Sequence, residues 1–184
     1  MATETKLRQL ADKECPVYYF YSSERYLVRQ AVAAATRILT ADSDEDATVL
    51  DGAAPEIEQL IMAAGTISFF GTRRVVVLPE IDPAAYSDKD LEELNSTLSS
   101  LENAVVVLGS VFELERSKLK TGKRAQKLIA QCKALGYTEE LAKPKPFELK
   151  MMMIDRAKEQ KTILPDGAAA ALLAVSYTHL TLPT

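Results

Sequence analysis

Short apolar runs alternate along the chain with longer segments in which apolar residues recur every three or four positions. The apolar runs have the length of strands and lie at 17–21, 48–50, 74–78, 104–108 and 137–141. The segments of helical period lie at 3–14, 22–39, 55–64, 87–101 and 118–135. Strands that alternate with helices pair in parallel and bury both faces of their sheet. The pattern therefore predicts an α/β fold with a mainly parallel five-stranded sheet and helices on both faces.

The chain changes character after the fifth apolar run. Pro144 and Pro146, two positions apart, favour an extended linker. Two helix-like segments follow, at 147–160 and 166–174. Two helices alone cannot enclose a core, so we expect an α/β domain over 1–142 and the start of a small helical domain over 143–174.

The last ten residues, 175–184, break the alanine-rich helical pattern before them and contain the only histidine, His179. They resemble the translated end of an adapter used in sequencing libraries. We therefore expect that 175–184 is an adapter-derived artefact, that the natural chain continues, and that His179 has no catalytic role. The alternative is a genuine β-like tail.

Composition and charge exclude several classes of protein. Of the 184 residues, 47% are hydrophobic and 26% charged, as in ordinary globular domains. The apolar runs are far shorter than the roughly 20 residues of a membrane-spanning helix, and the N-terminal segment has no signal-peptide pattern. We therefore expect a cytoplasmic protein with no membrane partner. Cys15 and Cys132 are too few and too far apart for a disulfide framework or a zinc site.

The places where an α/β sheet usually carries its chemistry lack the expected residues. The first strand-to-helix turn, Tyr21 to Glu24, has no glycine and no lysine to hold a phosphate group. Pro79 follows the third strand, where an ATPase presents its first magnesium-binding carboxylate, so we expect Glu80 and Asp82 to be solvated loop charges. The sequence predicts no catalytic residue, no metal site and no cofactor.

Positive charge is concentrated in one segment, 116–133, which holds seven basic residues and no acidic one. The candidates for contact with DNA phosphates or with a neighbouring acidic subunit are Arg116, Lys118, Lys120, Lys123, Arg124 and Lys127. The alternative is a solvated helix face, because no aromatic residues lie among these charges to stack on bases.

The most distinctive segment is Ala63 to Arg74, in which two phenylalanines stand between two glycines and are followed by two arginines. It resembles a segment of the delta subunits of the bacterial DNA polymerase III clamp loader. There, a helix is followed by a small residue, two large hydrophobic residues, a short turn and a basic residue, and then by a strand ending in Leu-Pro-Glu. The resemblance extends over nearly all of the first 174 residues and about the first half of that family's chain.

The resemblance implies a degenerate AAA-plus domain, similar to P-loop domains, that binds and opens the beta sliding clamp for loading onto primed DNA during replication. The residues it assigns to clamp binding are Ile67, Ser68, Phe69 and Phe70. Phe69 stands where many relatives have leucine, and the first turn lacks a glycine common in relatives.

The resemblance also implies an assembly. The partners would be the beta sliding clamp and other clamp-loader subunits, the latter through a C-terminal domain absent from this sequence, with DNA contacted indirectly or weakly. Such a chain would be a subunit of a DNA-directed DNA polymerase, a nucleotidyltransferase, with no active site of its own.

Residue geometry also favours docking by the phenylalanine pair. Two adjacent phenylalanines on a short turn cannot both point inward from a regular helix, so at least one should be exposed. The alternative is that both cap the sheet as core residues. Two rival functions stay open: a nucleotide-dependent AAA-plus ATPase or P-loop enzyme that binds at Ser22 to Glu24, and a scaffold that uses the basic segment for protein contacts.

Overall fold

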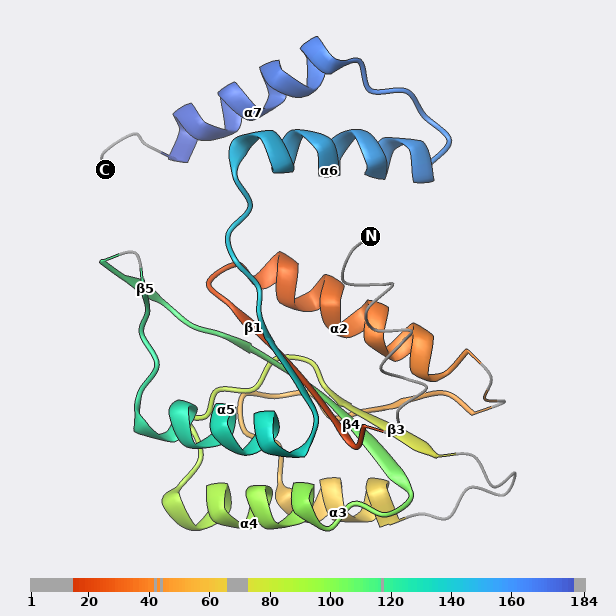
Figure 1. Cartoon of the computed structure of the whole chain (residues 1–184), viewed down its shortest axis with the longest axis vertical. Coiled ribbons are helices and arrows are strands. Elements are labelled where there is room, and N and C mark those ends of the chain that lie inside the picture. Colours follow the sequence, from red (N-terminus) through yellow and green to blue (C-terminus); the bar gives the residue numbers. More distant parts are fainter. Residues whose placement is uncertain (1–14, 42, 44, 66–72, 117, 181–184) are drawn as a thin grey trace. The chain divides into compact units, whose positions relative to one another are not determined.

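The computed structural model describes residues 15–41, 43, 45–65, 73–116 and 118–180, with only the backbone described over 175–180 (Figure 1). The leading helix predicted over 3–14 lies outside these residues. The chain divides into two compact units, Met1–Ala142 and Lys143–Thr184.

The first unit is built on a five-stranded parallel sheet, as predicted. Its strands are β1 (Val17–Ser22), β2 (Thr48–Val49), β3 (Arg74–Leu78), β4 (Ala104–Val111) and β7 (Tyr137–Glu140). The order across the sheet is β2-β3-β4-β1-β7, and every pairing is parallel. Strands β1 and β4 therefore lie inside the sheet, where valine and aromatic side chains are buried on both faces.

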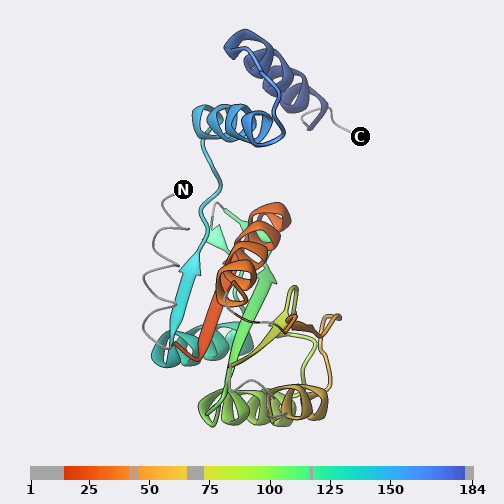
Figure 2. The same ribbon diagram turned by 90° about the vertical axis from the view of Figure 1, so that its right-hand side faces the viewer.

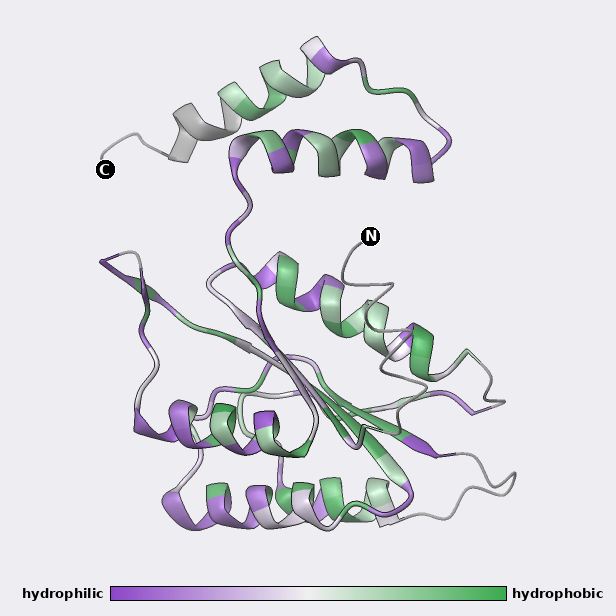
Figure 3. Cartoon of the chain, in the orientation of Figure 1, coloured by the Kyte–Doolittle hydropathy of each residue, from purple (hydrophilic) through white to green (hydrophobic). Residues whose placement is uncertain are grey.

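Helices cover both faces, also as predicted, and Figures 1 and 2 show their distribution. Helix α2 (Arg25–Leu39) lies on one face, and α3 (Ile57–Gly65), α4 (Asp88–Ser99) and α5 (Lys123–Leu135) lie on the other. Side chains alternate along each strand, so β1 sends Tyr18 and Phe20 toward α2 and Val17 and Tyr19 toward the other helices. Figure 3 shows the resulting hydrophobic strands between helices whose outer faces are hydrophilic.

Two local features help to stabilise the helices on the face opposite to α2. Ser87 caps α4, as its side chain accepts a hydrogen bond from the backbone N–H of Asp90 at 3.1 Å. Cys132 of α5 is buried, and burial raises the pKa of its thiol to about 12. The thiol therefore stays protonated and serves as packing.

The helix predicted over 118–135 is wrong in its first part. Residues Leu114–Glu115 and Lys118–Leu119 form a short antiparallel hairpin of strands β5 and β6, and α5 begins only at Lys123. Arg116 adopts a positive φ of 50°, which allows the tight turn between the two strands. The chain thus makes a hairpin after β4 before it re-enters a helix.

The second unit consists of α6 (Pro146–Glu159) and α7 (Asp166–Leu180), which are joined by an ion pair of 2.8 Å between Lys150 and Asp166. The predicted end of the last helix at residue 174 is wrong, because helical backbone continues to Leu180. Residues 175–180 are therefore not a β-like tail. Within the described part of the chain, no helix is long and apolar enough to cross a membrane.

The close approach of β4 to the loop after β3 gives a test of this packing. A Cβ atom on Gly109 would collide with the carbonyl oxygen of Pro79 and lie 2.7 Å from Cγ1 of Val28. We expect Gly109→Ala to lower the free energy of unfolding, measured by urea denaturation, by about 1–3 kcal/mol. The control is Gly65→Ala, where a Cβ meets nothing within 4 Å. Equal stability of the two variants would contradict the packing described.

Candidate functional site

The parallel sheet has two chemically different edges. All strand carboxyl ends meet at one edge and all amino ends at the other. Open α/β sheets usually bind ligands beyond the carboxyl ends of their strands. Candidate residues from the sequence, or the residues that flank them, lie at both edges of this sheet.

At the carboxyl-end edge, the turn between β1 and α2 is tied to the protein itself. The buried Ser22 hydroxyl donates a hydrogen bond to the carbonyl oxygen of Leu141 at 2.6 Å and accepts one from the backbone N–H of Glu24 at 3.2 Å. Glu24 stands at the N-cap of α2, where its carboxylate would repel a phosphate group. The turn is therefore not a phosphate cradle of the glycine-rich kind.

The loop after β3 is also tied to its neighbours. Glu80 is not a solvated loop charge as predicted, because its carboxylate lies 2.6 Å from the guanidinium of Arg25 and 3.5 Å from that of Arg29. Asp82 accepts a hydrogen bond from the backbone N–H of Ala84 at 2.9 Å and so caps a turn. Among the described residues, no group of three or more histidine, cysteine or acidic side chains is placed to hold a metal ion.

Near the same edge, two buried hydrogen bonds link β1 and β4 to the loop after β3. The Tyr19 hydroxyl donates to the Ser110 hydroxyl at 2.9 Å, which donates to the carbonyl oxygen of Ile81 at 2.8 Å. Burial raises the pKa of Tyr19 well above its usual value, so this hydroxyl remains a neutral donor. Polar groups at the carboxyl-end edge are thus joined to one another by hydrogen bonds and ion pairs within the protein.

The amino-end edge holds both ends of the distinctive segment. Gly65 ends α3, and the Arg73 guanidinium donates to the carbonyl oxygen of Ala104 at 3.4 Å, beside the start of β4. The backbone N–H of Arg74 donates to the carbonyl oxygen of Asn103 at 3.0 Å. The predicted clamp-binding residues, Ile67, Ser68, Phe69 and Phe70, lie between these anchors but outside the described residues.

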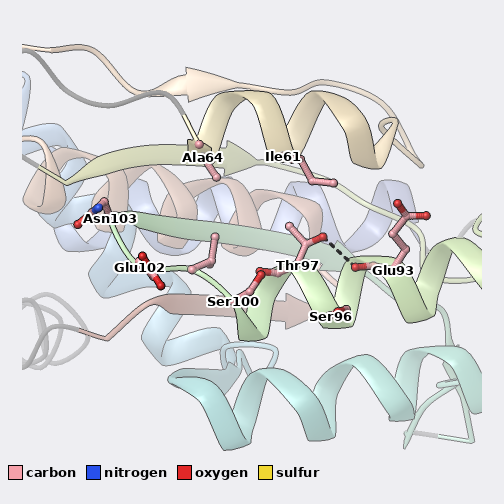
Figure 4. A pocket seen from close by; sticks show the side chains of 10 residues that line it. Ile61, Ala64, Glu93, Ser96, Thr97, Ser100, Glu102 and Asn103 are labelled. Carbon is pink, nitrogen blue, oxygen red and sulfur yellow. Dashed lines mark hydrogen bonds between the residues drawn. The ribbon is translucent and has the colours of Figure 1, made fainter.

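A pocket of about 500 Å³ opens between α3 and α4 at this edge (Figure 4). This α3–α4 pocket is lined by Ile61 and Ala64 of α3, Glu93 and Thr97 of α4, and Leu101 and Glu102 of the following loop. Gly65 and Asn103 also line it, which places it beside the anchors of the distinctive segment. No local sequence pattern indicates this pocket, because it forms only where α3 and α4 pack side by side.

The six basic candidates are divided by the structure between the hairpin and α5. Three of them form ion pairs with acidic side chains of the same unit: Arg124 with Asp88 at 2.7 Å, Lys127 with Glu92 at 3.0 Å, and Lys120 with Glu113 at 3.9 Å. Arg116 and Lys118 belong to the hairpin, and Lys123 begins α5. The pairs of Arg124 and Lys127 join α5 to α4, so part of the basic segment connects two helices.

The ion pair between α4 and α5 changes the acidity of its carboxyl group. The hydrogen bond from Arg124 and its positive charge hold the pKa of Asp88 below its usual value. Both side chains are exposed to solvent, so the pair is a surface contact of small energy.

Comparison with known proteins shows the fold. The sequence matches no family model and no curated protein. The clamp loader delta protein of Bacillus subtilis is similar in structure, with 22% identity and a TM-score of 0.58 over 92% of this chain and 51% of that protein. A DNA polymerase III gamma subunit-related protein of Thermotoga maritima is similar with 17% identity and a TM-score of 0.57, over 85% of this chain and 52% of that one.

A third solved structure extends the comparison to replication initiation. Domain III of the Thermotoga maritima replication initiation protein DnaA is similar with 12% identity and a TM-score of 0.59, over 94% of this chain and 74% of that one. The chain therefore has the AAA-plus-like fold of clamp-loader and DnaA domains. It spans about half the length of the two clamp-loader-related proteins.

Removal of Arg124 tests the contact between α4 and α5. We expect the pKa of Asp88, followed by NMR titration of its carboxyl carbon, to rise toward its usual value in Arg124→Ala. Because the folded pKa is the lowered one, the pair stabilises the fold above the usual carboxyl pKa and loses this effect as the pH falls through the lowered value. Lys133→Ala, an exposed charge change on the same helix, serves as the control. An identical Asp88 titration in both variants would show that the pair does not form.

Proposed function

We propose that this chain is the N-terminal part of a clamp-loader delta subunit, which binds the beta sliding clamp and opens it for loading onto primed DNA. The observation that carries the proposal is the position of the two described ends of the distinctive segment, Gly65 and Arg73, in this fold. The similarity of fold to a clamp loader delta protein over 92% of the chain supports it. The anchors of the segment, Gly65 and Arg73, lie at the amino-end edge, away from the edge where α/β sheets usually bind nucleotides.

The clamp would be held by the phenylalanine pair. Burial of one phenylalanine side chain in a partner's pocket contributes roughly 1.5–3 kcal/mol, and aromatic anchors dominate many interfaces. Phe69 and Phe70 would supply this contact, with Ile67 and Ser68 beside them. Preferential binding to the open form of the ring would shift the ring's equilibrium toward opening.

The nucleotide would be handled by other subunits of the assembly. The turn at Ser22 to Glu24 is bonded within the protein, and Glu80 is paired with two arginines. These contacts favour a mechanical subunit over a nucleotide-dependent enzyme. Contacts with the other clamp-loader subunits would come from a further domain, and the basic residues Arg116, Lys118 and Lys123 would contribute at most weakly to DNA binding.

The central test is the affinity of the chain for a bacterial sliding clamp. We expect Phe69→Ala combined with Phe70→Ala to weaken clamp binding by at least about a hundredfold, because two buried aromatic anchors are lost. Circular dichroism should stay that of the native fold. Phe147→Ala, which removes a phenylalanine that is 68% exposed in the second unit, is the matched control and should bind as the unchanged protein does.

Two outcomes would contradict the proposal. Unchanged clamp affinity of the double variant would exclude the phenylalanine pair as the anchor. Clamp binding that requires added ATP and magnesium would favour the nucleotide-dependent alternative, since the proposed chain binds the clamp without nucleotide.

A further inference from the structure

We propose that the α3–α4 pocket receives a lysine or arginine side chain of the sliding clamp, as a second anchor beside the phenylalanine pair. The inference rests on the proposed function. It assigns to the interface a group of described residues that the family resemblance did not identify. Three properties of the pocket support it: its apolar wall, its unpaired acidic groups and its position.

One wall of the pocket is apolar. Ile61, which lines it, is 45% exposed. Ala64 and Leu101 continue this surface as half-buried residues. The wall therefore fits the hydrocarbon part of a long side chain.

Among the described residues, the charged groups that line the pocket are all acidic. Glu93 and Glu102 lie on either side of Thr97 and Ser100 in Figure 4, and the described part of the lining includes no lysine, arginine or histidine. Neither glutamate forms an ion pair with any residue that the structure describes. On the other side of the same helix, Asp88 and Glu92 are both paired with bases of α5. The acidic side chains of α4 that face α5 are thus paired with bases, whereas Glu93 contributes negative charge to the pocket.

Two of the remaining polar side chains are bonded within the protein. The Thr97 hydroxyl donates to the carbonyl oxygen of Glu93 at 2.9 Å, and the Ser100 hydroxyl donates to the carbonyl oxygen of Thr97 at 3.1 Å. A ligand in the pocket would meet an apolar wall with carboxylate acceptors, beside the Ser96 hydroxyl and the Asn103 amide. A lysine or arginine, with its apolar stem and charged tip, matches this combination. The volume of about 500 Å³ leaves room for such a side chain.

The position of the pocket identifies the protein that would supply this side chain. Gly65, the last residue of α3, lines the pocket and lies two residues before Ile67. A partner that binds the phenylalanine pair would therefore pass next to the pocket. One clamp surface would present a hydrophobic pocket to the phenylalanines and a basic side chain to Glu93 or to Glu102.

Neutralising the two glutamates tests the inference. We expect Glu93→Gln combined with Glu102→Gln to weaken binding to a purified sliding clamp about tenfold at low salt, and to make the affinity less dependent on salt concentration. Both substitutions keep the size of the side chain and the fold. The matched control is Glu113→Gln combined with Glu115→Gln, which changes the net charge equally but on the hairpin after β4.

The experiment separates this inference from the proposed function. Loss of binding in the Phe69→Ala and Phe70→Ala variant, together with equal affinities of the pocket and hairpin variants, would overturn the inference alone. Failure of the unchanged protein to bind the clamp would overturn the proposed function, and the inference with it. Weaker binding in the pocket variant than in the hairpin variant is the result that we expect.

Discussion

The parallel pairing of β1 with β4 in the interior of the sheet is the constraint on which the rest of the first unit depends. Six residue pairs join the two strands, from Val17 with Val106 to Ser22 with Val111. The side chains of both strands are almost entirely buried, so the register is fixed by packing on both faces. Together with the parallel pairing of β7, β3 and β2, it creates one edge of carboxyl ends and one edge of amino ends.

The two edges differ in whether their polar groups are bonded within the protein. At the carboxyl-end edge, Ser22 is bonded to Leu141 and Glu80 is paired with Arg25, so polar groups that could face a ligand are used within the protein. The amino-end edge has an open pocket whose carboxylates form no ion pair with a described residue, and it holds the two anchors of the segment that carries the phenylalanines. This difference between the two edges supports the proposal that the chain binds a protein partner and does not carry out nucleotide chemistry.

Local sequence signals predicted the strands and most helices because burial on both faces demands continuous apolar runs, as in Val75 to Leu78. The hairpin after β4 was missed because its turn depends on the backbone conformation of a single residue, Arg116, which no periodicity reveals. The ion pairs of Glu80 could not be predicted because they join residues far apart in the sequence; Arg29 and Glu80 are 51 positions apart. The α3–α4 pocket likewise depends on tertiary packing, which no local pattern reveals.

The most direct measurement of the central claim, that binding takes place at the amino-end edge, is hydrogen–deuterium exchange of the chain with and without a sliding clamp. The account predicts slower exchange of backbone amides in 57–74 and 100–103 when the clamp is present, and no change in 22–25 or 80–82. Protection confined to 22–25 and 80–82 would place the partner at the carboxyl-end edge and contradict the account.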